Sequence, residues 1–140
     1  MRQLAWLHAT PKPPAGSRRA KGDRPDARLS RINDLKRRKI APQLPPNPAP
    51  HLTDRLIEIG LSEAAGMGAA PLSWQTIAAW QRLTAVPIEP WEARLLRRLS
   101  VAYLAEGRRA ENETCPPPWR TEVTQAERDA EEADLMRLLG

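Results

Sequence analysis

Large apolar side chains recur at helical spacing through the middle of the chain, in two successive series. The series are Trp74, Ile77, Trp80 and Leu83, then Trp91, Leu95, Leu99 and Tyr103. Intervals of three and four residues place side chains on one face of a helix, whereas a half-buried strand alternates every second residue. Ser73 is a favoured N-cap, and Pro90 suits the first turn of a helix because its missing N–H leaves no bond unmade. The pattern predicts two amphipathic helices joined by a short turn.

A third helix is predicted ahead of this pair. Its apolar residues run from Leu52 to Leu61, with Thr53 as the N-cap, and we expect it to continue to about Ala65. Residues 66–68 are Gly, Met and Gly, and they end this helix because glycine adopts the left-handed conformation of a C-terminal cap. No alternating pattern lasts longer than three or four residues, so we expect no sheet.

Two further helices are expected outside this central segment. Apolar residues at three-residue spacing within a basic stretch predict a short helix near 28–40. The segment that starts at Thr124 fits a capping box with Glu127 and has high helix propensity as far as residue 139. Its apolar residues are mostly small, so we expect this last helix to pack weakly or to extend away from the body.

Proline divides the chain into regions. Nine of the fifteen prolines lie at or before position 50, where they disfavour a packed core. The expected fold class is therefore all-α, with a small helical core domain at 51–107. An extended, basic, Pro-rich N-terminal arm over 1–50, with its short helix near 28–40, precedes this domain. A Pro-rich linker and an acidic C-terminal helix follow it at 108–140.

A core of this size has consequences for stability. A domain with about fifty core residues is marginal alone and gains stability from a partner or from self-association. A homo-oligomer is therefore compatible with the sequence. Within the arm, Leu4, Trp6 and Leu7 offer a short apolar anchor at the tip.

The net charge of +5 hides a strong asymmetry along the chain. Residues 1–41 hold twelve Lys/Arg and three Asp, a charge of +9, whereas the remainder holds ten basic and fourteen acidic residues, a charge of −4. Such a basic arm predicts weak, nonspecific binding to nucleic acid at low salt, or binding to an acidic protein surface. No base-reading module accompanies the arm, and Glu92 on the helix after Pro90 disfavours contact with phosphate.

Enzyme signatures are missing from the sequence. Cys115 is the single cysteine, His8 and His51 are far apart, and no phosphate-binding Gly-rich loop is present. The acidic residues between 127 and 134 are typical of a solvated helix face. We therefore expect no catalytic residue, no metal, no cofactor and no enzymatic activity. No apolar run approaches the roughly 20 residues that span a bilayer, so we expect an intracellular protein with no membrane segment.

The candidate functional residues are partner-binding ones. Tryptophan is enriched in interface hot spots, and arginine recognises carboxylates and phosphates. The candidates are Trp80, Trp91, Trp119, Arg37 and Arg38. Burial in the core is the competing interpretation for the tryptophans on the two central helices.

The string between residues 71 and 104 resembles small proteins of tailed phages and prophages. It comprises Pro71-Leu72-Ser73-Trp74, Ile77, Ala79-Trp80, Pro90-Trp91-Glu92, Leu95, Leu99 and Ala102-Tyr103-Leu104. Proteins of this kind are described as tail assembly chaperones or minor tail proteins. The resemblance implies a non-enzymatic role in tail morphogenesis, in the host bacterial cytoplasm, through binding a tape-measure or tail-tube protein. The resemblance is also compatible with a protein that is retained in the virion.

Two other functions remain open at this point. One is a basic nucleic-acid-binding regulator that uses the arm and the helix near 28–40. The other is a stable virion connector whose arm threads between neighbouring subunits.

Overall fold

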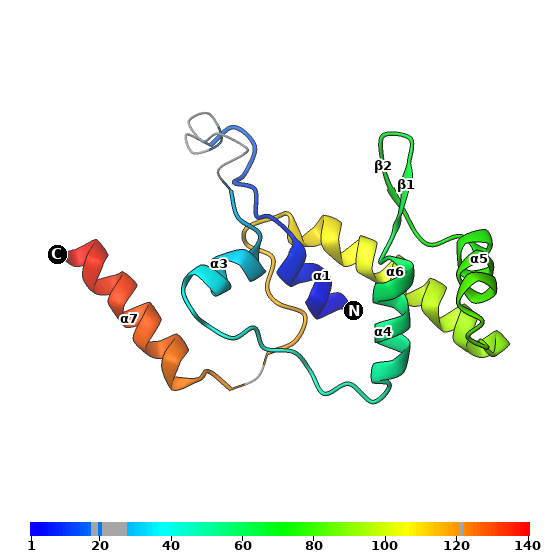
Figure 1. The fold of residues 1–140 in the computed structure, drawn as a ribbon. Helices are drawn as coiled ribbons and strands as arrows, with labels where there is room; N and C mark the ends of the chain where they lie inside the picture. The colour runs from blue at the N-terminus through cyan, green and yellow to red at the C-terminus, as the bar shows by residue number, and fades with distance from the viewer. Residues whose placement is uncertain (18–19, 21–27, 121) are drawn as a thin grey trace.

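The computed structural model describes residues 1–17, 20, 28–120 and 122–140. Over these residues the chain forms six helices and one β-hairpin (Figure 1). The elements are α1 (Arg2–His8), α3 (Arg31–Arg37), α4 (Pro50–Ile59), β1 (Glu63–Ala65), β2 (Gly68–Ala70), α5 (Trp74–Thr84), α6 (Pro90–Ala110) and α7 (Gln125–Leu139). The expected helical character is confirmed, and the all-α class is corrected by the hairpin.

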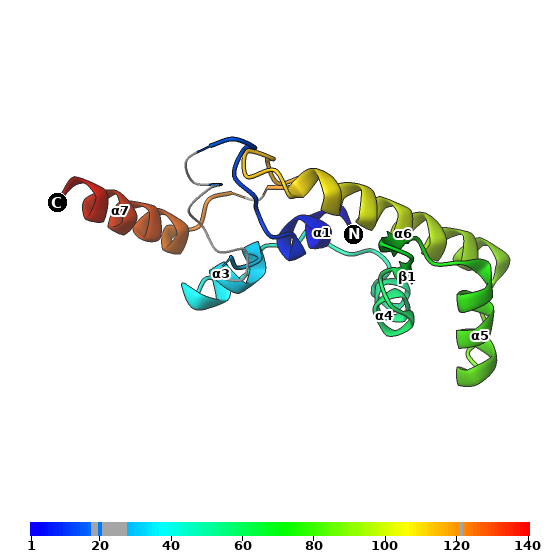
Figure 2. The same cartoon turned by 90° about the horizontal axis from the view of Figure 1, so that it is seen from above.

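The 21-residue helix α6 is the spine of the molecule. Helix α4 and strand β2 contact α6, and α1 packs along its C-terminal half (Figures 1 and 2). A cluster of buried side chains joins α4, α5 and α6. Its members are Leu56, Leu72, Ile77 and Leu96. The start of α5 and the start of α6 therefore share one small core, as the apolar spacing predicts.

Two buried carboxylates on α6 hold other helices in place. Arg55 Nη1 of α4 donates to Glu92 Oε1 at 2.9 Å, and Arg2 Nε of α1 donates to Glu106 Oε2 at 2.9 Å. Both carboxylates are nearly inaccessible to solvent. A buried charge without a partner costs several kcal/mol, so each ion pair specifies where one helix docks on α6.

A buried hydroxyl does the same for the segment around the hairpin. Ser100 is fully buried on α6. Its Oγ donates to the Leu61 carbonyl at 2.8 Å and accepts from the Leu72 N–H at 3.0 Å. These two backbone groups flank the hairpin, so one side chain fixes both ends of it on α6.

The hairpin stands where the sequence predicts the end of a helix. Helix α4 ends at Ile59 rather than near Ala65, because Gly60 has φ 109°, which a helix does not allow. Strands β1 and β2 then pair antiparallel, with Ala65 opposite Gly68. Gly66 has φ 51° at the first position of the two-residue loop, as a type II′ turn requires.

The N-terminus also differs from the expected extended arm. Residues 2–8 form α1, which packs on α6 and α3 and in which Ala5 and Leu7 are buried. Part of the expected arm, residues 18–19 and 21–27, lies outside the described residues. Helix α3 falls within the segment near 28–40 in which the sequence predicts one.

Helix α7 differs from the other helices in its surroundings. None of its residues is buried, and it extends away from the body (Figures 1 and 2). Among the described residues, no helix combines the length and the apolar composition needed to cross a bilayer.

The packing of α1 can be tested by truncating its buried leucine. Leu7 is 1 % exposed, so we expect Leu7→Ala to lower the free energy of unfolding by about 2–5 kcal/mol. Leu83→Ala is the matched control, because Leu83 is 87 % exposed and its loss is expected to change stability by less than about 0.5 kcal/mol. Urea unfolding followed by tryptophan fluorescence measures both. Equal midpoints for the two variants would show that α1 is not part of the folded core.

Candidate functional site

One long face of α6 is open to solvent. The exposed residues at three- and four-residue intervals on this face are Trp91, Arg94, Arg98, Val101 and Ala105. The opposite face carries the buried Leu96, Ser100 and Glu106. The helix therefore separates an inner, hydrogen-bonded face from an outer face that combines arginine with large apolar side chains.

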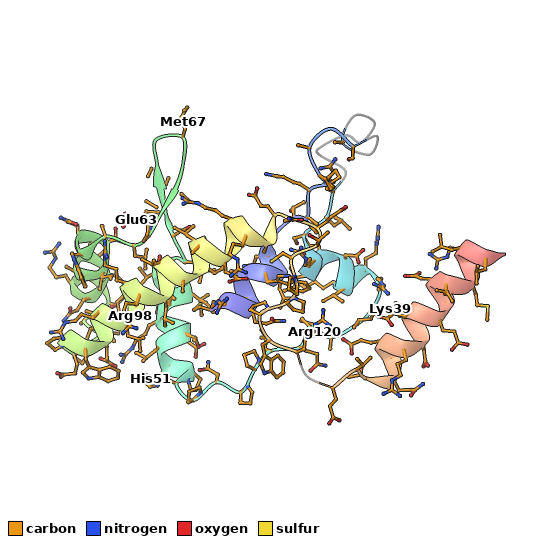
Figure 3. All side chains as sticks on the ribbon, turned by 180° about the vertical axis from the view of Figure 1, so that it is seen from behind. Lys39, His51, Glu63, Met67, Arg98 and Arg120 are labelled. Carbon is orange, nitrogen blue, oxygen red and sulfur yellow. The ribbon has the colours of Figure 1, made fainter. Side chains whose placement is uncertain are left out.

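A groove lies where the start of α5 meets this outer face. Its volume is about 410 Å³. It is lined by Trp74, Arg94, Arg97, Arg98, Val101 and Ala102. We call these six residues together with Trp91 the Arg–Trp face. Figure 3 shows Arg98 on α6, at the end of the molecule that carries α5.

The tryptophans of this face are only partly covered. Trp74 is 50 % exposed and Trp91 is 55 % exposed. The Arg97 guanidinium lies 5.4 Å from the centre of the Trp74 ring, in cation–π geometry. The indole of Trp74 thus supports a cation on one side and keeps much of its surface in contact with water.

The positive charge of the Arg–Trp face is not neutralised by neighbouring carboxylates among the described residues. Arg94, Arg97 and Arg98 form no ion pair with any described residue. The acidic residues of α6, Glu92 and Glu106, are buried on the other side and are paired there. The sequence predicts that Glu92 disfavours phosphate contact, which would require an exposed carboxylate; this is wrong, because Glu92 is buried and paired with Arg55. Three arginines beside apolar surface can bind carboxylates of a partner.

Two polar side-chain atoms at this end of the molecule lack a hydrogen-bond partner among the described residues. Trp80 Nε1 and Arg97 Nε are both buried without a partner. An unsatisfied buried donor costs about 1–3 kcal/mol. The Nε1 edge of Trp80 is thus enclosed, whereas the residue as a whole is half-buried, and its role as a partner-binding residue stays a prediction.

The position of Trp74 depends on the hairpin. Ser73 caps α5 by accepting from the Thr76 N–H at 3.1 Å. Glu63 of β1 accepts from the Ser73 N–H and from Ser73 Oγ, both at 2.8 Å. Figure 3 shows Glu63 at the base of the hairpin. Hydrogen bonds from Thr76 and Ser73 lower the pKa of Glu63 below its ordinary value of 4.5. The carboxylate thus fixes the start of α5 and the Trp74 beside it.

The other sequence-predicted candidates lie at the far end of the molecule. Arg37 Nη2 pairs with Asp34 at 2.5 Å, and Arg38 Nη2 pairs with Asp134 of α7 at 3.3 Å. The backbone N–H of Trp119 donates to Gln3 Oε1 at 3.2 Å. The structure therefore does not bring these residues together with Trp91.

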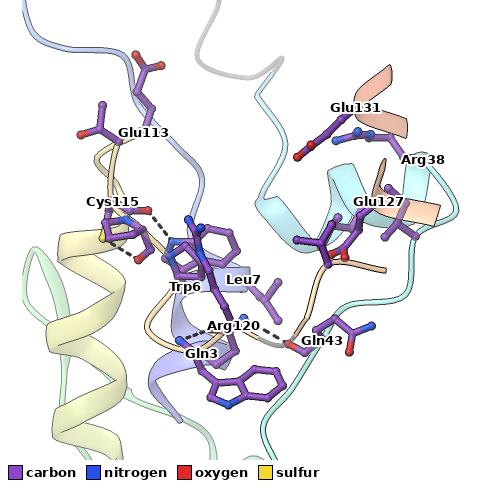
Figure 4. Close-up of a pocket in the computed structure, with 17 residues that line it drawn as sticks. Gln3, Trp6, Leu7, Arg38, Gln43, Glu113, Cys115, Arg120, Glu127 and Glu131 are labelled. Atoms are coloured by element: carbon purple, nitrogen blue, oxygen red, sulfur yellow. Dashed lines mark hydrogen bonds between the residues drawn. The ribbon is translucent and has the colours of Figure 1, made fainter. Parts of the chain in front are cut away.

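A second cavity, of about 520 Å³, lies around Trp119. Figure 4 shows it between α1, α3 and the first turns of α7, with Glu127 and Glu131 on the side of Arg38. Trp6 lines it too, and its Nε1 donates to the Cys115 carbonyl at 2.9 Å. The indole of Trp6 and the backbone N–H of Trp119 therefore join the segment after α6 to α1.

Arg31 of α3 has an internal role instead of the phosphate contact that the basic stretch suggests. Its Nη1 donates to the Ala110 carbonyl at 2.6 Å, and its Nη2 to the Asn112 carbonyl at 3.1 Å. The guanidinium also lies 4.4 Å from the centre of the Trp6 ring. Arg31 therefore joins α3 to α1 and to the end of α6.

The sequence analysis did not select Trp74, Arg94 or Arg98. Their signal is the run of exposed α6 positions that contains arginine and no acid, which becomes visible once Glu92 is assigned to the buried face. Over the described residues, no group of three or more His, Cys, Asp and Glu side chains is placed to hold a metal ion. Comparisons of the chain with protein-family models, curated proteins and solved structures gave no match.

The role of Glu63 predicts a specific pH dependence. Because its folded pKa is depressed, the stabilisation it provides is present above about pH 4.5 and is lost as the pH falls through the folded pKa. We expect Glu63→Gln to be less stable than the wild type at about pH 7, with the difference shrinking at about pH 3. Glu58→Gln, an exposed change on α4, is the control. Urea unfolding at both pH values measures the difference, and a gap of equal size at both would refute the assignment.

Proposed function

We propose that this chain is a non-enzymatic docking protein of phage tail morphogenesis, which binds a tape-measure or tail-tube subunit through the Arg–Trp face. The observation that carries the proposal is the exposure of Trp74 and Trp91. Both belong to the string between residues 71 and 104 that resembles tail assembly chaperones and minor tail proteins. Residues of that string which do not fill the core are available for a partner.

The chemistry of the face supports protein docking. Interface hot spots are enriched in tryptophan and arginine, and they combine a desolvated aromatic anchor with charged residues around it. Trp91 can serve as such an anchor, with Arg94 and Arg98 beside it on the same face of α6. A partner with apolar and acidic residues matches this surface best.

Docking of this kind suits either a transient chaperone or a retained virion component. A chaperone acts in the host cytoplasm and is released before the tail is complete, whereas a connector remains bound. The two differ in whether the chain is found in purified particles, which mass spectrometry of the virion decides.

The nucleic-acid-binding alternative has less support. Two of the basic residues that motivated it, Arg31 and Arg38, are engaged within the molecule. The arginines of α6 can still contact phosphates, so bare binding to DNA at low salt does not discriminate. Binding that persists at about 0.15 M salt and selects a sequence would favour a regulator.

Pull-down with tagged tail proteins tests the docking proposal. We expect Trp91→Ala and Trp74→Ala each to weaken binding to a tape-measure or tail-tube protein by about 30-fold, the effect of losing a hot spot of about 2 kcal/mol. Met67→Ala is the control, because Met67 is fully exposed at the tip of the hairpin (Figure 3).

Two results would contradict the docking proposal. One is unchanged binding by both tryptophan variants. The other is a wild-type chain that ignores tail proteins and selects one DNA sequence at about 0.15 M salt.

A further inference from the structure

Helix α7 presents an outer face that none of the described residues covers. Glu127, Ala130 and Asp134 are half-buried, and Asp134 is ion-paired to Arg38 at the end of α3. The remaining face points to solvent. Its exposed residues at helical spacing are Asp129, Glu132, Leu135, Met136 and Leu139.

The composition of this outer face changes from one end of the helix to the other. Its carboxylates lie in the N-terminal half, and its apolar side chains lie in the C-terminal half. The exposed fractions of Leu135 and Leu139 are 58 % and 76 %. Over its whole length α7 has five acidic and two basic residues. Isolated helices of about 15 residues are marginal in water, so an uncovered helix with this pattern gains stability by packing on a partner.

The Arg–Trp face matches this composition with the opposite charge. It offers Arg94, Arg97 and Arg98, which form no ion pair with a described residue, beside the apolar surfaces of Trp74 and Val101. The lengths match as well. The outer face of α6 from Trp91 to Ala105 and helix α7 each span 15 residues, which is about 22 Å of helix.

The two surfaces of one molecule do not meet. Helices α7 and α5 lie at opposite ends of the molecule in both views (Figures 1 and 2). We propose that α7 of one molecule docks in the groove between α5 and α6 of a second copy, head to tail. This contact needs no other protein, so it does not rest on the proposed role in tail assembly.

The geometry has a consequence for the assembly. A contact between two different surfaces leaves one free groove and one free α7 at the ends, so it forms open chains or rings rather than a closed two-fold dimer. One helix in one groove is a small interface, for which we expect dissociation constants in the micromolar range. The ionic part weakens with salt, because the Debye length falls to about 8 Å at 0.15 M.

Sedimentation equilibrium of charge-reversed variants tests the contact. We expect the wild-type mass to rise above 15.7 kDa with concentration, by more at low salt. Arg94→Glu/Arg98→Glu and Asp129→Arg/Glu132→Arg should each weaken association at least tenfold, since each places like charges opposite one another. Mixed in equal amounts, the two variants should associate again, because opposite charges then meet across the contact.

A charge-matched control variant separates an effect of the contact from an effect of net charge. Lys36→Glu/Arg82→Glu makes the same change in net charge as Arg94→Glu/Arg98→Glu, but on exposed residues outside the groove, and it should associate as the wild type does. Circular dichroism checks that all variants fold. A wild type that stays at 15.7 kDa up to about 1 mM would overturn the proposal. Failure of the mixed variants to associate would do so too.

Discussion

Three polar side chains on the buried face of α6 determine how the rest of the molecule is arranged. Glu92 binds α4, Ser100 binds the segments that flank the hairpin, and Glu106 binds α1. Apolar burial is non-directional, so Leu96 and its neighbours favour compactness without specifying a register. A buried carboxylate that loses its arginine is strongly destabilising, by about 3–5 kcal/mol. The polar contacts therefore select one arrangement among the many that the small apolar core allows.

The same contacts create the character of the outer face. Helix α6 contains acids and bases in its sequence, but folding draws Glu92 and Glu106 inside and leaves the arginines around Arg98 outside. Charge segregation on α6 thus results from burial rather than from composition. An arginine-rich exposed surface and a core that specifies the packing are two sides of one helix.

The sequence predicted those helices whose position depends on interactions between residues close together in the chain. The cap at Ser73 and the spacing of apolar residues located α5 and α6, because both act within a few residues. The hairpin was missed because Gly66 fits a helix end as well as a type II′ turn. Helix α1 was missed because its stability comes from α6. Periodicity showed that Trp91 shares a face with its neighbours, but not that Glu92 would be on the buried side, since that depends on Arg55 of another helix.

The dependence of α1 on α6 has a consequence for synthesis of the chain. Arg2 and Glu106 are 104 residues apart in sequence. A seven-residue helix does not persist alone in water, and α1 lacks its main packing partner until α6 has been made, because α3 contacts it less extensively. At about 5–20 residues per second, about 100 residues take on the order of 5–20 s. We expect the segment from α4 to α6, with its shorter-range contacts, to collapse first. Throughout that interval the apolar side of the first residues, with Leu7 at its centre, is accessible to the chaperones of the cell.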